Sequence, residues 1–560
     1  MGRWVGDFET TTDPNDCRIW AWAVCNIDNP YQIDYGIDGK SFLKYLIDLD
    51  GRLFFHNLGF DGRFILDLLL SLGFRHTKER DYKLKSGEFN TLISQRGKFY
   101  SISIATRRGI VSIRDSLKLL PMSVDRIAKS FNLPDDEQKG SIDYEMHRPI
   151  GYKPTDQEWN YIRNDVLIVA RALRIEFDAG LDRMTAGSNA FHGFKEMFGK
   201  KEFTSTFPVI EPEVDSVIRK AYRGGFTYCD ERFKGVDVGP GISCDFNSMY
   251  PSVMLKYFFP VGKPVGFDGE YKQDNDFSLY VQALTCTFRL KKNGIPMIQL
   301  QGNWLYAQHE YLKEVIEPAS LVLTSVDLKL FFDNYDVFVM SWDGGYKFRA
   351  KRGLFDSYIT TWRKEKETST GGRREIAKLM LNSLYGKFGT NTNVTQKIPY
   401  MDEDKVVRLS TDDEEIRDPI YIPVAAFVTA YARDELIRAI MANRKRFIYC
   451  DTDSLHLLGV DMPKDVKMHD TEFGCWKFEG IFQRARHIRA KCYIWDLNDE
   501  ISIVCAGMPS NVKRLCNFDN FHLGFSNLDS EGNVIPGMGK LIPKPVPGGV
   551  VLDPRPYRLR

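Results

Sequence analysis

Alternating apolar and polar residues predict a β-strand near the start of the chain. In Val5-Gly6-Asp7-Phe8-Glu9 the acidic residues stand two positions apart. Because successive side chains of a strand point to opposite faces, Asp7 and Glu9 share one face. Two neighbouring carboxylates can hold a metal ion, although an exposed acidic strand edge would show the same pattern.

Two predicted helices add further carboxylates to this part of the chain. An apolar strand pattern ends at Phe55, and the helix after it has Asp61 near its first turn. A second helical pattern spans residues 159–177, where Tyr161 and Asp165 are four apart and share a face. Tyr161 can orient a water molecule beside the acids. The candidate metal ligands here are Asp7, Glu9, Asp61 and Asp165.

Three more residues have candidate roles beside these acids. Asn57 and Phe60 can hold a nucleotide through amide and ring contacts. Lys139 follows the acidic run 135–137 and can reach a phosphate, although a solvated lysine is the more common situation.

A second acidic group is predicted at the tip of a β-hairpin. Two apolar runs flank Asp451-Thr452-Asp453, although an ordinary turn rich in Asp and Thr is the alternative. Another predicted strand carries Asp245 and ends at Tyr250. Two charges about 4 Å apart repel by roughly 4 kcal/mol at an effective dielectric of 20, so converging carboxylates need cations. Oxygen ligands of this kind select Mg²⁺ or Mn²⁺, and a two-ion site fits in-line phosphoryl transfer.

The segment 371–388 predicts a helix with one packed face and one basic face. Ile376, Met380 and Leu384 recur every four residues and predict the packed face. Arg and Lys side chains aimed together with a Tyr can bind a triphosphate and stack on a nucleotide. Residues 347–378 hold ten Lys or Arg against four acids, which suits phosphates, although a solvated helical face is the alternative. The polar face is formed by Arg374, Lys378, Asn382 and Tyr385.

Other segments have less specific patterns. The glycine pair in Tyr222-Arg223-Gly224-Gly225 by itself indicates only a turn. Residues 256–353 show mixed strand and helix without catalytic spacing, and 389–423 indicate a protruding hairpin. Residues 484–493 combine basic residues with an aromatic and suit a nucleic-acid backbone. The Gly- and Pro-rich tail indicates a small terminal subdomain.

The composition is that of a globular protein. Of 560 residues, 43% are hydrophobic and 27% charged, and the net charge of +1 gives no sign of a polyanionic partner. The ten cysteines include no Cys-x-x-Cys pair, which predicts reduced thiols and argues against zinc or a disulfide framework. Because no apolar run reaches the roughly 20 residues that span a bilayer, we expect a soluble intracellular protein.

Several motifs, in order along the chain, resemble those of a known enzyme family. Asp-Phe-Glu-Thr at residue 7, Asn-x-x-Phe-Asp at 57 and Tyr-x-x-x-Asp at 161 are similar to the three exonuclease motifs of proofreading DNA polymerases. The segments 245–251, 378–386, 449–454 and 491–493 resemble the polymerase motifs of family B. Asp-Phe-Asn-Ser-Met-Tyr-Pro, Tyr-Arg-Gly-Gly between the two halves and Gly-Gly-Val-Val-Leu near the end are similar to the protein-primed bacteriophage branch, of the Bacillus phage φ29 type.

The resemblance implies roles for the second acidic group and its surroundings. Asp245 and Asp453 would bind the metals for synthesis, with Asp451 as a supporting catalytic carboxylate. Tyr250 would lie beneath the sugar and exclude ribonucleotides. Residues implied to bind the incoming dNTP are Tyr250, Lys366, Arg374, Lys378, Asn382 and Tyr385. Residues implied to contact DNA are Tyr222, Arg223, Gly224, Gly225, Lys491 and Tyr493.

The same resemblance implies a 3′–5′ exonuclease in the first part of the chain. The four acids named there would bind its metals, and Tyr161 and Lys139 would take part in catalysis. Asn57 and Phe60 would hold single-stranded DNA.

The implied fold is α/β and multidomain, with an RNase-H-like exonuclease domain and a right-hand polymerase made of palm, fingers and thumb with two insertions. The expected divisions are the exonuclease domain at 1–185, palm at 186–255, an insertion for terminal protein or DNA at 256–353, fingers at 354–389, a second insertion for strand displacement and processivity at 390–421, palm at 422–518 and thumb at 519–560.

The expected function is replicative DNA synthesis with proofreading, started on a terminal protein, processive and strand-displacing. Mg²⁺, which Mn²⁺ can replace, and dNTPs are the expected cofactor and substrates. Expected partners are template and primer DNA, the terminal protein and a single-strand-binding protein, for a monomer in the cytoplasm of a host bacterium. Two alternatives stay open: a DNA-primed family B polymerase, and a non-catalytic nucleic-acid-binding replication factor.

Overall fold

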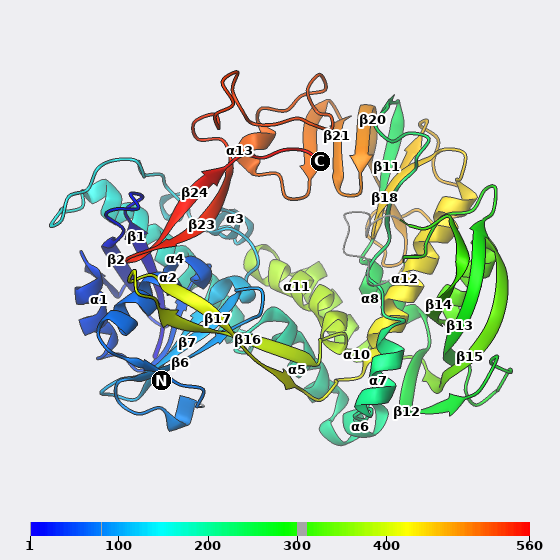
Figure 1. The fold of residues 1–560 in the computed structure, drawn as a ribbon, viewed down its shortest axis with the longest axis horizontal. Coiled ribbons are helices and arrows are strands. Elements are labelled where there is room, and N and C mark those ends of the chain that lie inside the picture. Colours follow the sequence, from blue (N-terminus) through cyan, green and yellow to red (C-terminus); the bar gives the residue numbers. More distant parts are fainter. Residues whose placement is uncertain (1, 80, 300–310) are drawn as a thin grey trace.

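A computed structural model describes residues 2–79, 81–299 and 311–560. Its elements form an N-terminal α/β domain, a second large sheet with surrounding helices, a smaller inserted sheet and two long β-hairpins (Figure 1). Within these ranges, no helix is long and apolar enough to cross a membrane. All ten cysteines are described and none is in a disulfide, as predicted.

The N-terminal domain is an eight-stranded sheet covered by helices. Its strands are β1 (Gly2–Thr10), β2 (Ile19–Asn26), β3 (Ile33–Gly36), β4 (Gly51–Phe55), β5 (Arg75–His76), β6 (Glu88–Ile93), β7 (Phe99–Ala105) and β8 (Ile110–Asp115). Its helices are α1 (Gly39–Leu46), α2 (Leu58–Ser71), α3 (Val124–Ser130) and α4 (Asp156–Asp178). The sheet order is β3-β2-β1-β4-β8-β7-β6-β5, with β1, β4 and β8 in parallel.

The predicted elements of this domain are confirmed. Strand β1 contains the alternating acids, and α4 begins at a capping box in which Thr155 and Glu158 bond each other's backbone N–H groups. Helix α4 packs on β1 and β2, which brings its buried face to the strand that carries Asp7.

The second sheet lies in the other half of the molecule. Its strands are β9 (Thr227–Cys229), β10 (Asp237–Val238), β11 (Gly241–Phe246), β18 (Phe447–Asp451), β19 (Ser454–Leu458), β20 (Trp476–Arg489), β21 (Cys492–Leu497) and β22 (Glu500–Cys505). The order is β22-β21-β20-β11-β19-β18-β9, with β10 beside β20. The predicted hairpin is therefore confirmed as β18–β19, and β11 lies next to it. The predicted strand with Asp245 is shorter than expected, because it ends at Phe246 and Tyr250 lies in the helix that follows.

Helices connect the two halves and support the second sheet. They are α5 (Ala186–Phe198), α6 (Lys200–Thr206), α7 (Pro212–Arg219), α8 (Met249–Lys256), α10 (Asp356–Thr368), α11 (Gly371–Phe388), α12 (Ile422–Ala442) and the short α13 (Ser510–Lys513). Helix α11 begins and ends as predicted, and Ile376, Met380 and Leu384 are all buried. Its apolar face packs against α5, α10 and α12.

Residues 256–353 contain a separate four-stranded sheet. It consists of β12 (Phe259–Phe267), β13 (Leu279–Leu290), β14 (Glu314–Thr324) and β15 (Tyr335–Lys351), with α9 (Ser325–Asn334) between the last two. The order is β12-β15-β13-β14. The aromatic residues of this segment, Trp304, Tyr306, Tyr311 and Tyr335, are the type that anchors a partner protein, but Tyr335 is only 1% exposed and cannot do so. Tyr311 packs on Phe226, and Trp304 and Tyr306 lie outside the described residues.

Two β-hairpins reach across to the N-terminal domain (Figure 1). They are β16 (Asn393–Met401) with β17 (Val407–Ile416), and β23 (Lys540–Val546) with β24 (Gly549–Arg555). Val407 of the first hairpin and Val550 of the second are buried in the apolar core of the N-terminal domain. The C-terminal segment is therefore no isolated subdomain, because its hairpin packs on α2.

Candidate active sites

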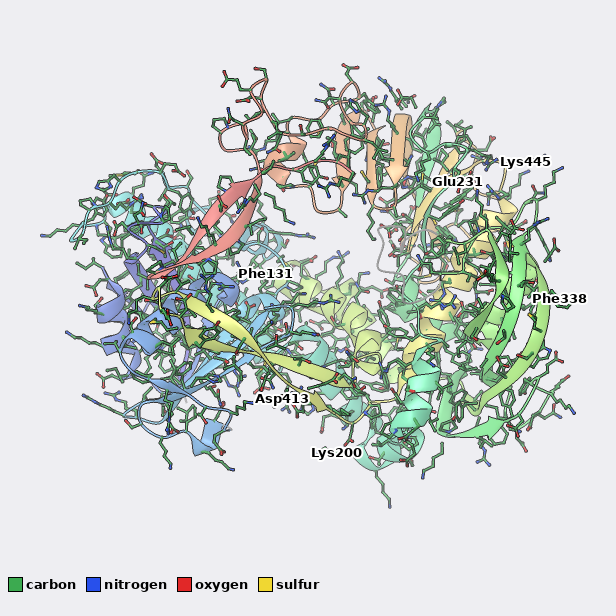
Figure 2. All side chains as sticks on the ribbon, viewed as in Figure 1. Phe131, Lys200, Glu231, Phe338, Asp413 and Lys445 are labelled. Atoms are coloured by element: carbon green, nitrogen blue, oxygen red, sulfur yellow. The ribbon has the colours of Figure 1, made fainter. Side chains whose placement is uncertain are left out.

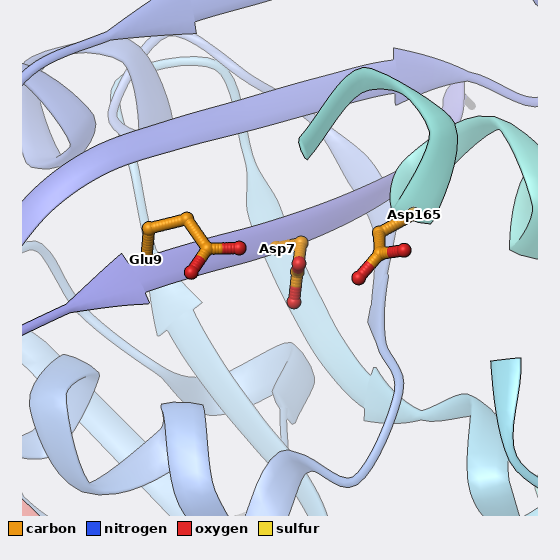
Figure 3. A group of neighbouring side chains, drawn as sticks. All are labelled: Asp7, Glu9 and Asp165. Carbon is orange, nitrogen blue, oxygen red and sulfur yellow. The ribbon is translucent and has the colours of Figure 1, made fainter. Parts of the chain in front are cut away.

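Carboxylates converge on the N-terminal sheet, as the strand and helix patterns predict. Asp7 and Glu9 on β1 and Asp165 on α4 each offer an oxygen within 4.8 Å of the others. Figure 3 shows the Asp7 carboxylate between those of Glu9 and Asp165. In the described part of the chain, this is the only such group of three or more His, Cys, Asp or Glu. Asp61, in the first turn of α2, is 4% exposed.

Burial and mutual repulsion favour the protonated forms of these acids. Burial, followed by the charges of Asp61, Asp165 and Glu9, raises the pKa of Asp7 well above its usual value. Burial and then the Asp165 charge raise the pKa of Glu9 to about 8. The pKa of Asp61 rises to about 8, with burial as the largest cause. Such a cluster ionises fully only when cations offset the repulsion.

The donor set fits a hard divalent cation. All candidate ligands are carboxylate oxygens, which Mg²⁺ and Mn²⁺ prefer. Asp165 Oδ1 is buried and has no hydrogen-bond partner among the described residues, so it is available to coordinate an ion.

Lys139 and Tyr161 lie at this cluster, as predicted. Lys139 pairs with Asp165, and its ammonium is 4.7 Å from the centre of the Tyr161 ring. The Tyr161 hydroxyl shares a 2.6 Å hydrogen bond with the Tyr144 hydroxyl. We did not predict Tyr144, because it lies in an irregular segment without periodic pattern. Two hydroxyls beside carboxylates can orient a water molecule.

The N-terminal acids border a cavity of about 840 Å³. Asn57 and Phe60, predicted to hold a nucleotide, line it from the start of α2. Leu541 and Val551 of the C-terminal hairpin also contribute to the lining. A cavity that combines carboxylates, an aromatic ring and apolar walls suits the end of a single nucleic-acid strand.

The second acidic site lies at the tip of the β18–β19 hairpin. Asp245 on β11 pairs in register with Ser454, and the Phe246 N–H donates to the Asp453 carbonyl at 2.7 Å. Burial, followed by the Asp453 charge, raises the pKa of Asp245 to about 7. Burial and the Asp451 charge raise the pKa of Asp453. Neighbouring carboxylates whose charges oppose ionisation in this way can hold divalent cations.

The third carboxylate of this site is already paired. Asp451 accepts hydrogen bonds from Lys491 Nζ at 2.6 and 2.7 Å and from the Thr227 hydroxyl at 2.8 Å. This arrangement agrees with a supporting role for Asp451 and places Lys491 at the site.

Positive charge gathers on α10 and α11. Arg374, Lys378 and Asn382 are exposed on the predicted face. Burial, then the charges of Arg374 and Lys378, lower the pKa of Lys366, so these three cations are close together. Lys366 Nζ also donates to the Ser248 hydroxyl at 3.4 Å, at the start of α8. Within the described residues none of these three cations forms a salt bridge, so together they can bind a polyanion such as a triphosphate.

Two tyrosines lie between this basic group and the acidic hairpin. The rings of Tyr250 and Tyr385 stack with centroids 4.1 Å apart and planes 27° apart. A Cβ atom on Gly225 would lie 3.1 Å from the Tyr250 hydroxyl and 2.8 Å from Thr452 Oγ1. The glycine pair of Tyr222–Gly225 therefore permits a close approach to the hairpin tip, a reason beyond an ordinary turn.

Arg223 and Tyr493 were both predicted to contact DNA, and both pack against other parts of the protein. Arg223 Nη1 is buried, and burial lowers the pKa of this guanidinium, which lies near Asp327 and Arg433. Tyr493 is 8% exposed and packs against Tyr449. The Arg223 guanidinium therefore lies inside the protein and supports the segment that carries it, whereas a contact of Tyr493 with the primer stays a prediction.

Lys477 and Glu479 of β20 belong to the second acidic site, although no motif marks them. Lys477 pairs in register with Asp245, so the two side chains share a face. Lys477 Nζ is 2.8 Å from a Glu479 oxygen. After burial and Asp453, the Glu479 charge also raises the pKa of Asp245, and the Lys477 charge lowers it. Only the pairing of β11 with β20 brings these residues together.

Comparisons with known proteins agree with this geometry. The family model for DNA polymerase type B, organellar and viral, matches residues 44–158 and 138–472. The DNA polymerase of Bacillus phage phi29 is 41% identical over 574 residues, which cover 98% of this chain and 97% of that protein. The chain belongs to the family B DNA polymerases. A polymerase of Streptococcus phage Cp-1 is 32% identical over 100% of this chain and 98% of its own length.

Solved structures match the whole polymerase. Phi29 DNA polymerase with primer-template DNA and incoming nucleotide substrates has a TM-score of 0.92 and 40% identity, with all of both chains covered. Its complex with primer-template DNA has a TM-score of 0.93 and 39% identity. The predicted fold class is confirmed: this DNA-directed DNA polymerase has an exonuclease domain joined to palm, fingers and thumb.

Proposed function

We propose that this polymerase replicates a phage genome and proofreads its product at a second site on the same chain. The observation that carries this proposal is the presence of two carboxylate groups on two different sheets, one on β1 and α4 and the other on β11 and the β18–β19 tip. We place Mg²⁺, or Mn²⁺ in its stead, at both groups. The enzyme would act in the cytoplasm of its host bacterium.

At the palm site, the chain would bind and orient primer and dNTP. Divalent cations held by Asp245 and Asp453 would lower the pKa of the primer 3′ hydroxyl and neutralise phosphate charge. Tyr250, stacked on Tyr385, would lie beneath the sugar, and Asn382 would line the nucleotide pocket. The triphosphate would be neutralised by Lys366, Arg374 and Lys378. DNA contacts would come from Lys491 and from the backbone of the glycine pair, with Tyr222 beside it.

At the N-terminal site, the four acids would hold the cations for 3′–5′ hydrolysis. Tyr161 would orient the attacking water and Lys139 would face the phosphate, because both lie at Asp165. The burial and mutual charge that oppose ionisation of these acids also support the role, since bound cations remove that opposition. Asn57 and Phe60 would hold the frayed strand in the cavity.

The proofreading proposal is tested with single-stranded DNA labelled at its 5′ end. With Mg²⁺ and without dNTPs, the wild-type enzyme should produce a ladder of shorter labelled products, and a 3′-terminal phosphorothioate should slow it. The Tyr161→Phe variant should degrade DNA more slowly yet extend a primer at the wild-type rate. Wild-type degradation by an Asp165→Asn variant would contradict the assignment.

We further propose that synthesis starts on the hydroxyl of a terminal protein and that a single-strand-binding protein assists it. The inserted sheet of residues 259–351 supports this because it stands outside the palm and presents apolar side chains to solvent. Ile316 is 79% exposed and Phe338, at the outer margin of the sheet in Figure 2, is 69% exposed. Large apolar side chains exposed on one small sheet suit a docking surface.

Protein priming is tested with a labelled dNTP and the protein encoded next to the polymerase gene. We expect transfer of label to that protein. Ile316→Ser with Phe338→Ser should reduce this transfer more than extension of a DNA primer, whereas an Ile501→Ser change on the exposed edge strand β22 should affect neither. Failure of the wild-type enzyme to label any protein would favour the DNA-primed alternative.

A further inference from the structure

Arg433 makes hydrogen bonds in two directions behind the polymerase site. Its side chain, on α12, is 4% exposed. Nε and Nη2 donate to the two carboxylate oxygens of Asp327 at 2.9 and 2.7 Å. Nη1 donates to the carbonyl oxygens of Arg223 and Gly224 at 2.8 and 2.7 Å. Asp327 is fully buried in the first turn of α9, so one guanidinium joins the inserted subdomain to the glycine-pair segment.

The segment that Arg433 holds continues directly into the polymerase site. The Thr227 hydroxyl donates to Asp451 at 2.8 Å, and the Thr452 N–H donates to the Phe226 carbonyl at 2.8 Å. Between these contacts and Arg433, Gly225 approaches Thr452 and the Tyr250 hydroxyl so closely that a Cβ atom would collide. Residues 223–227 therefore form a wall whose one side bonds to Arg433 and whose other side touches the hairpin tip.

A contribution to stability could explain the ion pair of Arg433 with Asp327, but it does not explain the two hydrogen bonds to carbonyl oxygens. Buried ion pairs contribute little net stability, because apolar residues of similar volume often replace them without loss. The two bonds to carbonyl oxygens have a different consequence. They fix the backbone of the two residues that directly precede Gly225, and Gly225 is the residue that lies against Thr452 and Tyr250. Side-chain packing cannot replace donors to carbonyl groups.

We propose that Arg433, oriented by Asp327, is a positioning residue that sets the place of Tyr250 and of the hairpin tip for nucleotide addition. The planar guanidinium suits this role because it bonds a carboxylate and two carbonyls at once, whereas a lysine ammonium has a single donor centre. Displacement of the wall would widen the space beneath the sugar, so selection against ribonucleotides depends on this contact as well as on the Tyr250 ring.

The test uses the full-length double variant Arg433→Met with Asp327→Leu. The buried group around Arg223 keeps its net charge in this variant, since one cation and one anion are removed together. We expect thermal unfolding close to wild type, a dNTP KM raised or kcat lowered by roughly 10- to 100-fold, and weaker discrimination against ribonucleotides. The single variant Arg433→Lys should also discriminate against ribonucleotides less well than the wild-type enzyme.

The matched control is Arg438→Met. Arg438 lies on the same helix, pairs with Asp434 and reaches Asp333 of α9 at the surface, but has no bond to residues 223–227. The Arg438→Met variant should therefore extend a primer and discriminate against ribonucleotides as the wild-type enzyme does.

Wild-type kinetics and discrimination in a folded double variant would overturn the proposal. If the double variant unfolds, Asp327→Asn decides instead, because an amide fills the same volume and loses one of the two acceptors for Arg433. Reduced discrimination against ribonucleotides in that variant supports the positioning role of Arg433, and unchanged discrimination contradicts it.

Discussion

Three non-glycine residues that precede a helix or form the hairpin tip adopt left-handed backbone conformations beside candidate catalytic groups. Asn57, with φ of 74°, precedes α2 at the N-terminal cavity; Ser248, with φ of 55°, precedes α8; and Thr452, with φ of 59°, separates Asp451 from Asp453. Such residues cost on the order of 1–3 kcal/mol each and persist where the surroundings fix them, often at functional sites. All three residues lie within sequence motifs that resemble those of the family. Because Asn, Ser and Thr also occupy ordinary turns, their left-handed backbone conformation could not be predicted from the sequence.

Tyr250 gives the first prediction at the residue scale. Because its ring stacks on Tyr385 beneath the proposed sugar position, Tyr250→Val should open that space and reduce discrimination against ribonucleotides roughly 10- to 100-fold. The measurement is the ratio of kcat/KM for a dNTP and its ribonucleotide. Tyr385→Phe, which keeps the ring, should retain most of the discrimination. An unchanged ratio in Tyr250→Val would exclude this role.

The carboxylates show which site residues are predictable. Asp7 and Glu9 follow from strand alternation, and Asp165 from helical spacing, because both periods are local properties of the sequence. Tyr144 and Glu479 were missed, since each reaches its site through a tertiary contact that no local period encodes. Arg223 was misplaced because a basic side chain next to a glycine pair can point inward as easily as outward.

The N-terminal acids predict how metal-free stability depends on pH. The pKa of Glu9 rises from 4.5 to about 8 on folding, and that of Asp61 from 3.8 to about 8. Between these limits the folded state binds more protons at these two acids than the unfolded state does. Their contribution to stability is therefore fully present below about pH 4 and is lost as the pH rises towards 8. In EDTA, the melting temperature should fall across this window.

The Glu9→Gln and Asp61→Asn double variant is the comparison, because its side chains cannot ionise and its melting temperature should change less with pH. Mn²⁺ should stabilise the wild-type enzyme more at pH 8 than at pH 5.5. Equal pH profiles for wild type and variant in EDTA would contradict the burial argument.

Among the elements, helix α11 begins and ends at the predicted residues, because its apolar residues recur at helical spacing on one side only. The hairpin β16–β17 was predicted as protruding, and its contact with the N-terminal domain was not. Val407 is 1% exposed in that domain's core, and Asp412 pairs with Lys78. A contact between segments so far apart leaves no local signal in the sequence.

The β16–β17 hairpin gives a prediction at the element scale. Replacement of residues 393–416 by a short Gly-Ser linker should shorten the products of primer extension and impair synthesis through duplex DNA, because an arm between the two halves of the molecule is lost. Gap filling of a few nucleotides should continue. Asp412→Ala, which removes a surface ion pair with Lys78 and leaves the hairpin in place, should behave like wild type. Unimpaired strand displacement by the deletion variant would refute the role.

At the scale of the whole molecule, two hairpins connect the polymerase half to the exonuclease domain (Figure 1). The core of that domain includes Val407 from one hairpin and Val546 and Val550 from the other. The C-terminal hairpin also lines the N-terminal cavity. The two acidic sites therefore belong to one connected structure, yet no ligand group is shared between them among the described residues. Independent chemistry at each site is the central claim.

The most direct test is a reciprocal comparison of two variants under one set of conditions with Mg²⁺. Asp453→Ala should reduce dNTP incorporation on a primed template by on the order of 10³-fold and leave degradation of single-stranded DNA near wild type. Asp7→Ala with Asp61→Ala should do the converse. Loss of both activities in either variant, with wild-type thermal unfolding, would contradict two separate metal sites.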